Sequence, residues 1–332
     1  TLTCHAHAPS SPPPDARPVG NAEAFHDLLR EYHAGSYTVR IPDANRLSPD
    51  LYRFTRALEV ILENPVDTVI FWSDSGAAAP IHHDDYDIIA IQLVGQKKWF
   101  LSSEPPSLPN TWVRAGETPP TLSSFDVHDV SPGDLLYLPR GTAHTVQSTS
   151  ESIHLSIGFV PVTARDAVNA MLDHHSDFDE LMRTGLLERA DDLAHDRGKD
   201  EIGVKIRRHL EQLLAQCQSD AFISAALEQR KARMITDLPK LPPSPAENRI
   251  TITSRVRHSE LAIAQMVTTE EFVDFSQPGS HILVHRGTED VMRFITETPE
   301  FLVKEIPGEI DDDVRLALVN RLLGCGYLDA AV

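Results

Sequence analysis

Apolar and polar residues repeat with two different periods along the chain, and the changes of period divide it into zones. Segments 21–33 and 48–64 carry apolar residues at helical spacing, with Ser48 and Asp50 placed where a helix begins. From about residue 66 to residue 162 the pattern becomes one of short β-branched or aromatic runs broken by Gly and Pro. These runs are "DTVIFW", "DIIAIQLV", "KKWFLS", "DLLYLP", "HTVQS" and "IHLSIGF". Many short strands at such spacing favour a sandwich or a barrel.

The second half of the chain returns to helical spacing. Between Thr163 and about Met234, the segments "AVNAML", "FDELMRTGLLERA" and "GVKIRRHLEQLLAQCQ" repeat apolar residues every three or four positions. The stretch "DLPKLPPSPAENR" has four prolines in 13 residues and predicts a linker, because proline cannot continue a helix. The last zone mixes strand-like "RITITSRV" and "HILVHRG" with helical "TEDVMRFITE" and "DDVRLALVNRLLGCG". The pattern predicts an α+β chain with a disordered tail (1–20), a β-rich domain (21–162), a helical region (163–234), a linker (235–249) and a mixed terminal domain (250–332).

Composition narrows the classes of partner. The formal net charge is −19, and residues 250–332 alone hold 7 basic against 14 acidic residues, so we expect no direct DNA binding. No uninterrupted apolar run is long enough for a membrane span, and the N-terminal residues lack the features of a signal peptide. Three scattered cysteines fit a reducing cytoplasm better than a disulfide framework. We therefore expect a cytoplasmic protein whose acidity either suits a cationic partner or serves solubility alone.

The segment "IHHDDYDII" (81–89) is the first candidate for chemistry. On extended backbone, side chains at positions i and i+2 share a face, so His-x-Asp is the natural two-ligand unit of a strand. Both His82/Asp84 and His83/Asp85 satisfy this spacing. A third ligand has to come from elsewhere, and "VSPGDLLYLPRGTAHTV" supplies His144 at the start of a strand. Two histidines and one carboxylate leave about three positions open on an octahedral ion, as in Fe(II) oxygenases. A structural zinc site is commonly closed with cysteine, and this zone has none.

Four blocks between Ala78 and Phe159 carry a family resemblance. They are "IHHDDYDII", "IQLVGQKKW", "SPGDLLYLPRGTAH" and "SIGF", in that order. They resemble the JmjC-type (cupin-fold) 2-oxoglutarate oxygenases, above all the ribosomal-oxygenase branch. The resemblance implies a double-stranded β-helix (jelly-roll) barrel, followed by dimerisation helices and a winged-helix-like domain. The chain departs from the family at Ile81, which separates Pro80 from the histidine, and at "WSDSGAAA", which replaces the usual glycine-rich segment before the site.

The resemblance also chooses between the two histidine–aspartate pairs. The family has another aspartate three residues after its metal-binding aspartate; counting from Asp84 reaches Asp87, whereas counting from Asp85 reaches Ile88. It thus implies iron(II) held by His82, Asp84 and His144, which are also the expected catalytic residues. Lys97 takes the position of the basic residue that pairs with the distal carboxylate of 2-oxoglutarate, while its neighbour Lys98 faces the other way. Ser156 is expected near this co-substrate, and dioxygen is the second co-substrate.

The function implied is that of an Fe(II)- and 2-oxoglutarate-dependent dioxygenase that hydroxylates a residue of a protein or peptide. A peptide or small natural product stays open as the substrate, as do a winged-helix regulator with a sensory cupin and an iron-binding cupin without turnover. We expect a basic substrate segment, attracted by Asp74, Asp85 and Asp87. Apolar stripes on the helical region predict a homodimer: Leu210, Leu213, Leu214, Cys217, Phe222, Ile223 and Leu227. Of the other conspicuous residues, we expect Trp99 to have a packing role, and His154 to lie in the core or at the rim rather than to be a fourth ligand. We expect His174 and His175 to face solvent.

Overall fold

The computed structural model describes residues 2–5, 17–108, 120–185, 196–241, 243 and 250–331. The chain divides into two compact units, Thr1–Pro161 and Val162–Val332. Within the second unit, helix α5 packs on strands β11 and β12 of the C-terminal zone. The helical region and the terminal zone therefore form one compact unit, where the sequence pattern predicts two domains joined by a linker. Among the described helices, none is long and apolar enough to cross a membrane.

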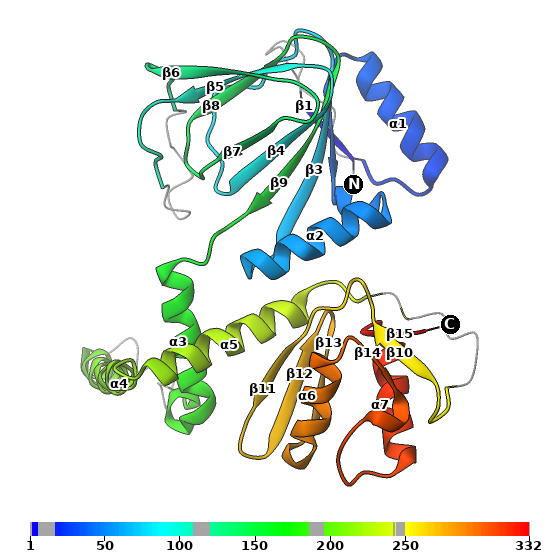
Figure 1. The fold of residues 1–332 in the computed structure, drawn as a ribbon. Helices are drawn as coiled ribbons and strands as arrows, with labels where there is room; N and C mark the ends of the chain where they lie inside the picture. The colour runs from blue at the N-terminus through cyan, green and yellow to red at the C-terminus, as the bar shows by residue number, and fades with distance from the viewer. Residues whose placement is uncertain are drawn as a thin grey trace. The chain divides into compact units, whose positions relative to one another are not determined.

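Two antiparallel sheets build the first unit (Figure 1). The larger sheet has the order β1-β2-β3-β9-β4-β7 and the smaller one β6-β5-β8. The strands are β1 (Thr3–His5), β2 (Thr38–Pro42), β3 (Val66–Ser73), β4 (Asp87–Val94), β5 (Lys97–Ser102), β6 (Phe125–Val130), β7 (Leu135–Leu138), β8 (His144–Ser148) and β9 (Ser152–Phe159). Consecutive strands β7, β8 and β9 alternate between the two sheets, as the jelly-roll expectation requires.

Alternation along the central strands separates a packed face from a cavity face. On β9, Leu155, Ile157 and Phe159 are buried against apolar residues of helix α2 (Pro49–Leu62). Their neighbours His154, Ser156 and Gly158 line a cavity instead, because successive side chains of a strand point to opposite faces. Helix α1 (Ala22–Ala34) packs Leu28 and Tyr32 near Val39 of β2. The helices thus cover the outer face of the large sheet and leave its inner face to the site.

The N-terminal residues differ from the disordered tail that composition predicts. Strand β1 pairs with β2, and both Leu2 and Cys4 are buried. Leu2 also forms an isolated bridge with Arg17. The reason is that Leu2 and Cys4 complete the apolar cluster under helix α1, a long-range contact that proline content does not reveal. Residues 6–16 lie outside the described residues.

The second unit begins with helices. Thr163 caps the first of them through a reciprocal capping box with Asp166. The segment "FDELMRTGLLERA" is broken at Asp179 rather than forming one helix, and a short 3₁₀ turn, η3, follows; residues 186–195 lie outside the described part. The helices are α3 (Ala164–Phe178), η3 (Glu180–Arg183), α4 (Asp196–Gln216) and α5 (Asp220–Asp237). Because α5 continues to Asp237, the helix extends into the predicted linker, of which residues 242 and 244–249 lie outside the described part.

Two small sheets and two helices complete this unit, with orders β14-β10-β15 and β11-β12-β13. The elements are β10 (Arg255–His258), β11 (Gln265–Thr268), β12 (Phe272–Gln277), β13 (Ser280–His285), α6 (Glu289–Glu297), β14 (Glu300–Leu302), α7 (Asp312–Gly324) and β15 (Leu328–Ala330). Two 3₁₀ turns, η5 (Arg286–Thr288) and η6 (Val303–Glu305), connect them, and a further one, η1 (Ala44–Arg46), belongs to the first unit. Val256, Phe275, Met292 and Leu322 belong to their common core. Strand β10 covers only the end of the predicted "RITITSRV", because residues 251–254 form a turn in which Ser254 N donates to Thr251 O.

Candidate metal centre

The backbone places His82 directly opposite His144. The two residues exchange both hydrogen bonds, from His82 N to His144 O (3.0 Å) and from His144 N to His82 O (2.8 Å). The same segment continues this pairing along β8, where Ala79 N donates to Val146 O at 2.9 Å. Segment 76–82 therefore extends the small sheet beyond β8 and holds the two histidines as neighbours.

Both imidazoles are oriented by the backbone. His82 Nδ1 lies 2.8 Å from the carbonyl oxygen of Pro80, and His144 Nδ1 lies 2.9 Å from that of Thr142. A carbonyl oxygen only accepts, so each Nδ1 carries the proton and donates it. Each Nε2 is then left with a free lone pair, which is the arrangement typical of metal-binding histidines.

Asp84 completes the group. Its carboxylate oxygens lie 3.9 Å from His82 Nε2 and 3.7 Å from His144 Nε2. These separations are too long for hydrogen bonds, but two ligand atoms that share one ion at about 2.1 Å lie up to about 4.2 Å apart. The three residues form the one group of three or more His, Cys, Asp or Glu in the described part of the chain that could hold a metal ion. Their donor atoms fit such an ion.

Asp87 fixes the turn that leads to His144. One of its carboxylate oxygens accepts a hydrogen bond from Tyr137 Oη, and the other accepts from Arg140 N at 3.0 Å. The bond to the Asp87 carboxylate raises the pKa of Tyr137 to about 12. In the same turn, Gly141 N donates to Asp84 O at 2.8 Å. Gly141 has a φ of +81°, and a Cβ there would lie 1.7 Å from the carbonyl oxygen of Ser107, so only glycine fits.

A cavity of about 750 Å³ opens from the three residues into the space between the two sheets. Trp99 is buried and stacks on the His144 ring, with centroids 5.8 Å apart and planes at 27°, which agrees with its predicted packing role. Burial and the neighbouring His82 lower the pKa of His144. A neutral His144 has the free lone pair that a metal requires.

Lys97 lies in the same cavity, on strand β5. Its side chain is almost completely buried, with 3% exposure, and Nζ donates to Ser73 Oγ at 3.0 Å. Burial lowers the pKa of Lys97 to about 8. Lys98 points the opposite way and pairs with Asp129 at 3.5 Å. The alternation predicted for the two lysines is confirmed, and among the described residues no carboxylate pairs with Lys97.

A JmjC-domain family model matches residues 43–167, which include the three candidate ligands and Lys97. The chain contains a JmjC domain. A relative, ribosomal oxygenase 2 of Rattus norvegicus, is 28% identical over 176 residues, which cover 50% of this chain and 37% of that protein. The ribosomal protein uL16 3-hydroxylase of Escherichia coli is 25% identical over 114 residues, which cover 32% of this chain and 29% of that protein. The chain therefore spans well under half the length of these relatives.

A solved structure shares the fold of the JmjC domain and its neighbour. It is that of YcfD, a ribosomal oxygenase from Escherichia coli, in complex with cobalt and 2-oxoglutarate. The TM-score is 0.52 at 17% sequence identity, and the match covers 88% of this chain and 78% of that one. The predicted likeness to the ribosomal-oxygenase branch is confirmed.

Several residues lie elsewhere in the JmjC domain than the sequence suggests. Asp87 does not flank the opening, because it is buried by its two hydrogen bonds. Neither Asp74 nor Asp85 lines the cavity, and Asp74 accepts from Ser75 N within its turn. The cavity carboxylates are instead Asp67 and Asp84. The prediction that Asp74, Asp85 and Asp87 form an acidic rim at the opening is therefore wrong for Asp87.

Sequence reasoning missed Arg40, Asp67 and Phe71, which line the cavity from β2 and β3. The signal was present in the alternation of "VDTVIFWS", where residues 67, 69, 71 and 73 share a face. Ser156 was predicted here and does line the cavity. His83, the alternative ligand, is not among the lining residues.

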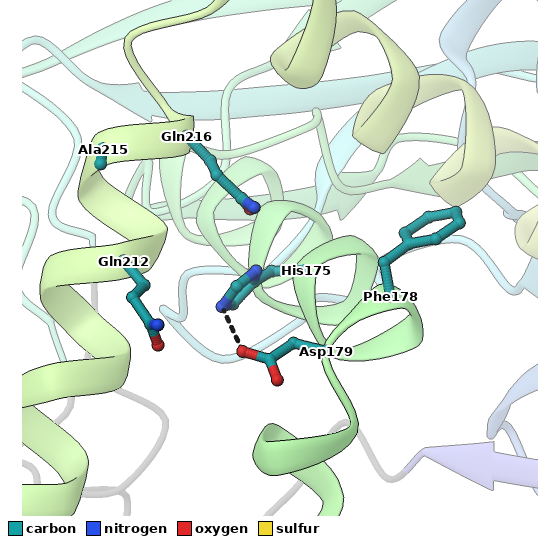
Figure 2. A pocket seen from close by; sticks show the side chains of 6 residues that line it. All are labelled: His175, Phe178, Asp179, Gln212, Ala215 and Gln216. Carbon is teal, nitrogen blue, oxygen red and sulfur yellow. Dashed lines mark ion pairs between the residues drawn. The ribbon is translucent and has the colours of Figure 1, made fainter.

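A second pocket, of about 410 Å³, lies between α3 and α4 in the other unit (Figure 2). His175 and Asp179 face each other there, with Nε2 and Oδ2 3.6 Å apart. His175 is only 4% exposed, so the expectation that it faces solvent is wrong. His174 likewise has a partner, with Nδ1 2.6 Å from Gln229 Oε1. Both histidines lie on the side of α3 that packs against its neighbouring helices, which the polar sequence around them conceals.

Proposed function

We propose that the chain is an Fe(II)- and 2-oxoglutarate-dependent dioxygenase that hydroxylates an amino-acid residue of a protein or peptide. The observation that carries this proposal is the group His82, Asp84 and His144 at one cavity with the buried cation Lys97, which pairs with no carboxylate among the described residues. A facial set of three ligands leaves room on the ion for a chelating co-substrate and dioxygen. When bound, iron and 2-oxoglutarate supply the oxidising chemistry that puts one oxygen atom of O₂ into a C–H bond.

The protein's own residues would bind and orient the metal ion and the co-substrate. His82 and His144 present Nε2 because their Nδ1 protons are held by backbone carbonyls, and Asp84 supplies the negative charge. Lys97 pairs with the distal carboxylate of 2-oxoglutarate, which gives the buried ammonium the counter-charge that it lacks. Ser156 offers a hydroxyl on the same face of β9. The surrounding sheets limit the access of water to this end of the cavity.

The relatives support a protein substrate. One is named a ribosomal protein hydroxylase and another a ribosomal oxygenase, and the structure of YcfD contains cobalt with 2-oxoglutarate. A basic segment of a ribosomal protein suits the net charge of −19, and Asp67 on the cavity wall suits it as well. A small natural product remains the alternative substrate, because segment 72–79, which precedes the proposed metal ligands, departs from the family pattern.

Turnover with candidate peptides tests the proposal. With basic peptides from ribosomal proteins, the enzyme should form succinate from 2-oxoglutarate only when Fe(II) and O₂ are present. The peptide should gain the mass of one oxygen atom. Charge-reversed peptides of equal length serve as the control, and rates with the basic peptides should fall as salt rises. Equal rates for both sets, without salt dependence, would favour a small-molecule substrate. An absence of succinate in every assay would leave only an iron-binding cupin.

We further infer that the protein is a cytoplasmic homodimer, joined through α3, α4 and α5. The apolar residues Leu210 and Leu214 of α4 are 54% and 64% exposed, and Phe178 of α3 is exposed as well. Apolar surface of this extent on neighbouring helices is typical of an interaction site. We also infer that residues 250–332 form a winged-helix-like domain. Its net charge of −7 opposes DNA binding, so we infer that it contacts protein instead.

A further inference from the structure

We propose that His154 binds the distal carboxylate of 2-oxoglutarate together with Lys97, as a second hydrogen-bond donor at the closed end of the cavity. This inference rests on the proposed function and adds a residue that neither the motif blocks nor the metal group indicates. The sequence alone leaves His154 as a core or rim residue.

The sheet register brings His154 to the inner wall. On strand β9 it pairs with Phe71 of β3 on one side and with Gln92 of β4 on the other. Its side chain is 5% exposed, and it lines the cavity with Lys97 and Ser73. Phe71, the β3 partner of His154, shares a face of its strand with Ser73, and Ser73 Oγ accepts the hydrogen bond of Lys97 Nζ at 3.0 Å. The charge of Lys97 also helps to lower the pKa of His154. A carboxylate that pairs with Lys97 therefore comes within reach of His154.

Aromatic neighbours fix the plane of the His154 ring. The Phe71 ring stacks on it, with centroids 5.0 Å apart and planes at 9°. The Trp99 ring approaches it at 77°, with centroids 5.7 Å apart. These rings exclude water from two sides and leave the ring edge for polar contacts. The ring is thus pre-oriented, which lowers the entropy lost when it binds a ligand.

One ring nitrogen of His154 is unsatisfied. Nδ1 is buried without a hydrogen-bond partner among the described residues. On the adjacent strand, Gln92 Nε2 donates to the carbonyls of Val94 and Gly95, which leaves Gln92 Oε1 buried and unpartnered too. A buried polar atom without a partner is costly and uncommon in a folded protein. Such a pair at the wall of a cavity indicates a bound group that completes the network.

A bound carboxylate can complete the hydrogen bonds of His154 and Gln92. Gln92 Oε1 can only accept, and a carboxylate can only accept, so both are satisfied by an imidazolium that donates from both nitrogens. Without a ligand, burial and Lys97 keep His154 neutral, because they hold its pKa well below the usual range. The charged and titratable groups that line the same cavity are Lys97 on β5, Arg40 on β2, Asp67 on β3, and the group of His82, Asp84 and His144. Of these, Lys97 acts together with burial to disfavour a proton on His154. A bound carboxylate reverses that balance, so binding takes up a proton there.

Calorimetry of the Co(II)-loaded protein without oxygen tests the proposal. Titration of 2-oxoglutarate in two buffers of different ionisation enthalpy, near pH 7, measures affinity and proton uptake together. His154→Leu should weaken 2-oxoglutarate binding about 10- to 100-fold, the range for a lost hydrogen bond to a charged group. His154→Gln, which keeps an N–H donor, should weaken binding less and abolish the proton uptake. Cobalt affinity should not change in either variant.

Two controls separate the outcomes. 2-Oxobutyrate, which lacks the distal carboxylate, should bind His154→Leu and the wild type equally. His128→Gln, an exposed histidine on β6, should match the wild type in every measurement. Wild-type affinity in His154→Leu, or unchanged proton uptake in His154→Gln, overturns the role of His154 and leaves the proposed function standing. If the wild type binds cobalt but no 2-oxoglutarate, both proposals fail; if His154→Leu does not fold, the His154→Gln measurements decide.

Discussion

Three side chains are the proposed metal ligands of the JmjC domain. His82→Ala, Asp84→Ala and His144→Ala should each abolish iron-dependent succinate release, because each removes a ligand atom from the group. The fold should survive, since the backbone bonds between His82 and His144 do not need the side chains. Isothermal titration with Fe(II) or Co(II) and circular dichroism measure the two effects.

His83→Ala is the matched control for these variants. His83 neighbours His82 but is not among the cavity-lining residues, so its loss should leave metal affinity within about twofold. If His83→Ala and Asp85→Ala abolish metal binding and the other pair does not, the assignment of the ligands is wrong.

Lys97 is placed for binding at the expense of stability. Its pKa falls to about 8 through burial, so below pH 8 the folded state holds a charge that water would solvate better. The destabilisation is complete below pH 8 and disappears as pH rises toward the unfolded value of 10.5. Lys97→Met should therefore raise the unfolding free energy of the metal-free protein at pH 7 by up to about 3 kcal/mol, and by less at pH 9.5.

Urea unfolding at both pH values measures this change, and Lys98→Met provides the exposed control, expected within about 0.5 kcal/mol of the wild type. Lys97→Met should also raise the KM for 2-oxoglutarate far more than it weakens metal binding. If the gain in unfolding free energy of Lys97→Met over the wild type is smaller at pH 7 than at pH 9.5, the buried charge of Lys97 does not destabilise the fold.

The turn between β7 and β8 carries His144 and is held by Asp87 at the start of β4. Asp87→Asn should weaken metal binding although no ligand changes, because a neutral amide replaces the carboxylate that accepts from both Tyr137 Oη and Arg140 N. The amide oxygen can accept only one of these two bonds, and the Tyr137 hydroxyl proton has to turn away from the amide N–H₂. The loss of two hydrogen bonds to a charged acceptor costs about 1–3 kcal/mol of unfolding free energy. Thermal unfolding and Co(II) titration measure the two effects.

Asp129→Asn is the control for this turn, because Asp129 is exposed and pairs only with Lys98 among the described residues. It should leave both measurements unchanged. Equal behaviour of the Asp87 and Asp129 variants would mean that the turn does not depend on these hydrogen bonds.

The complete molecule should be a dimer through its helices. Leu210→Glu with Leu214→Glu should convert it to a monomer in light scattering at micromolar concentration, because burying two carboxylates at an apolar contact is costly. Arg208→Glu, an exposed change of charge on the same helix, is the control and should leave the mass unchanged. A monomeric wild type would show that these apolar residues serve another contact.

Local pattern was sufficient for much of the architecture. The runs "DIIAIQLV", "KKWFLS" and "HTVQS" coincide with β4, β5 and β8, and Ser48 caps α2 as predicted. These segments could be predicted because strand alternation and helix capping depend on residues close in sequence. Strands β2 and β6 were missed, and "FDVHDV" shows only weak alternation between exposed apolar and polar residues. Helix α5 extends past the predicted boundary because Met234 and Ile235 near its end are buried in one cluster with Leu238 and Ile263.

The sequence by itself determined the residue types of the metal group, their strand spacing and the single inward lysine, because each depends on period-two alternation or on a motif. Only the tertiary structure decided that Asp87 is a buried anchor, that His154 and Arg40 line the cavity, and that His175 is buried. These outcomes depend on which strands and helices become neighbours. That choice is made by contacts between residues up to about 120 positions apart, such as His33 with Glu151 (|i−j|=118), and no short window contains them.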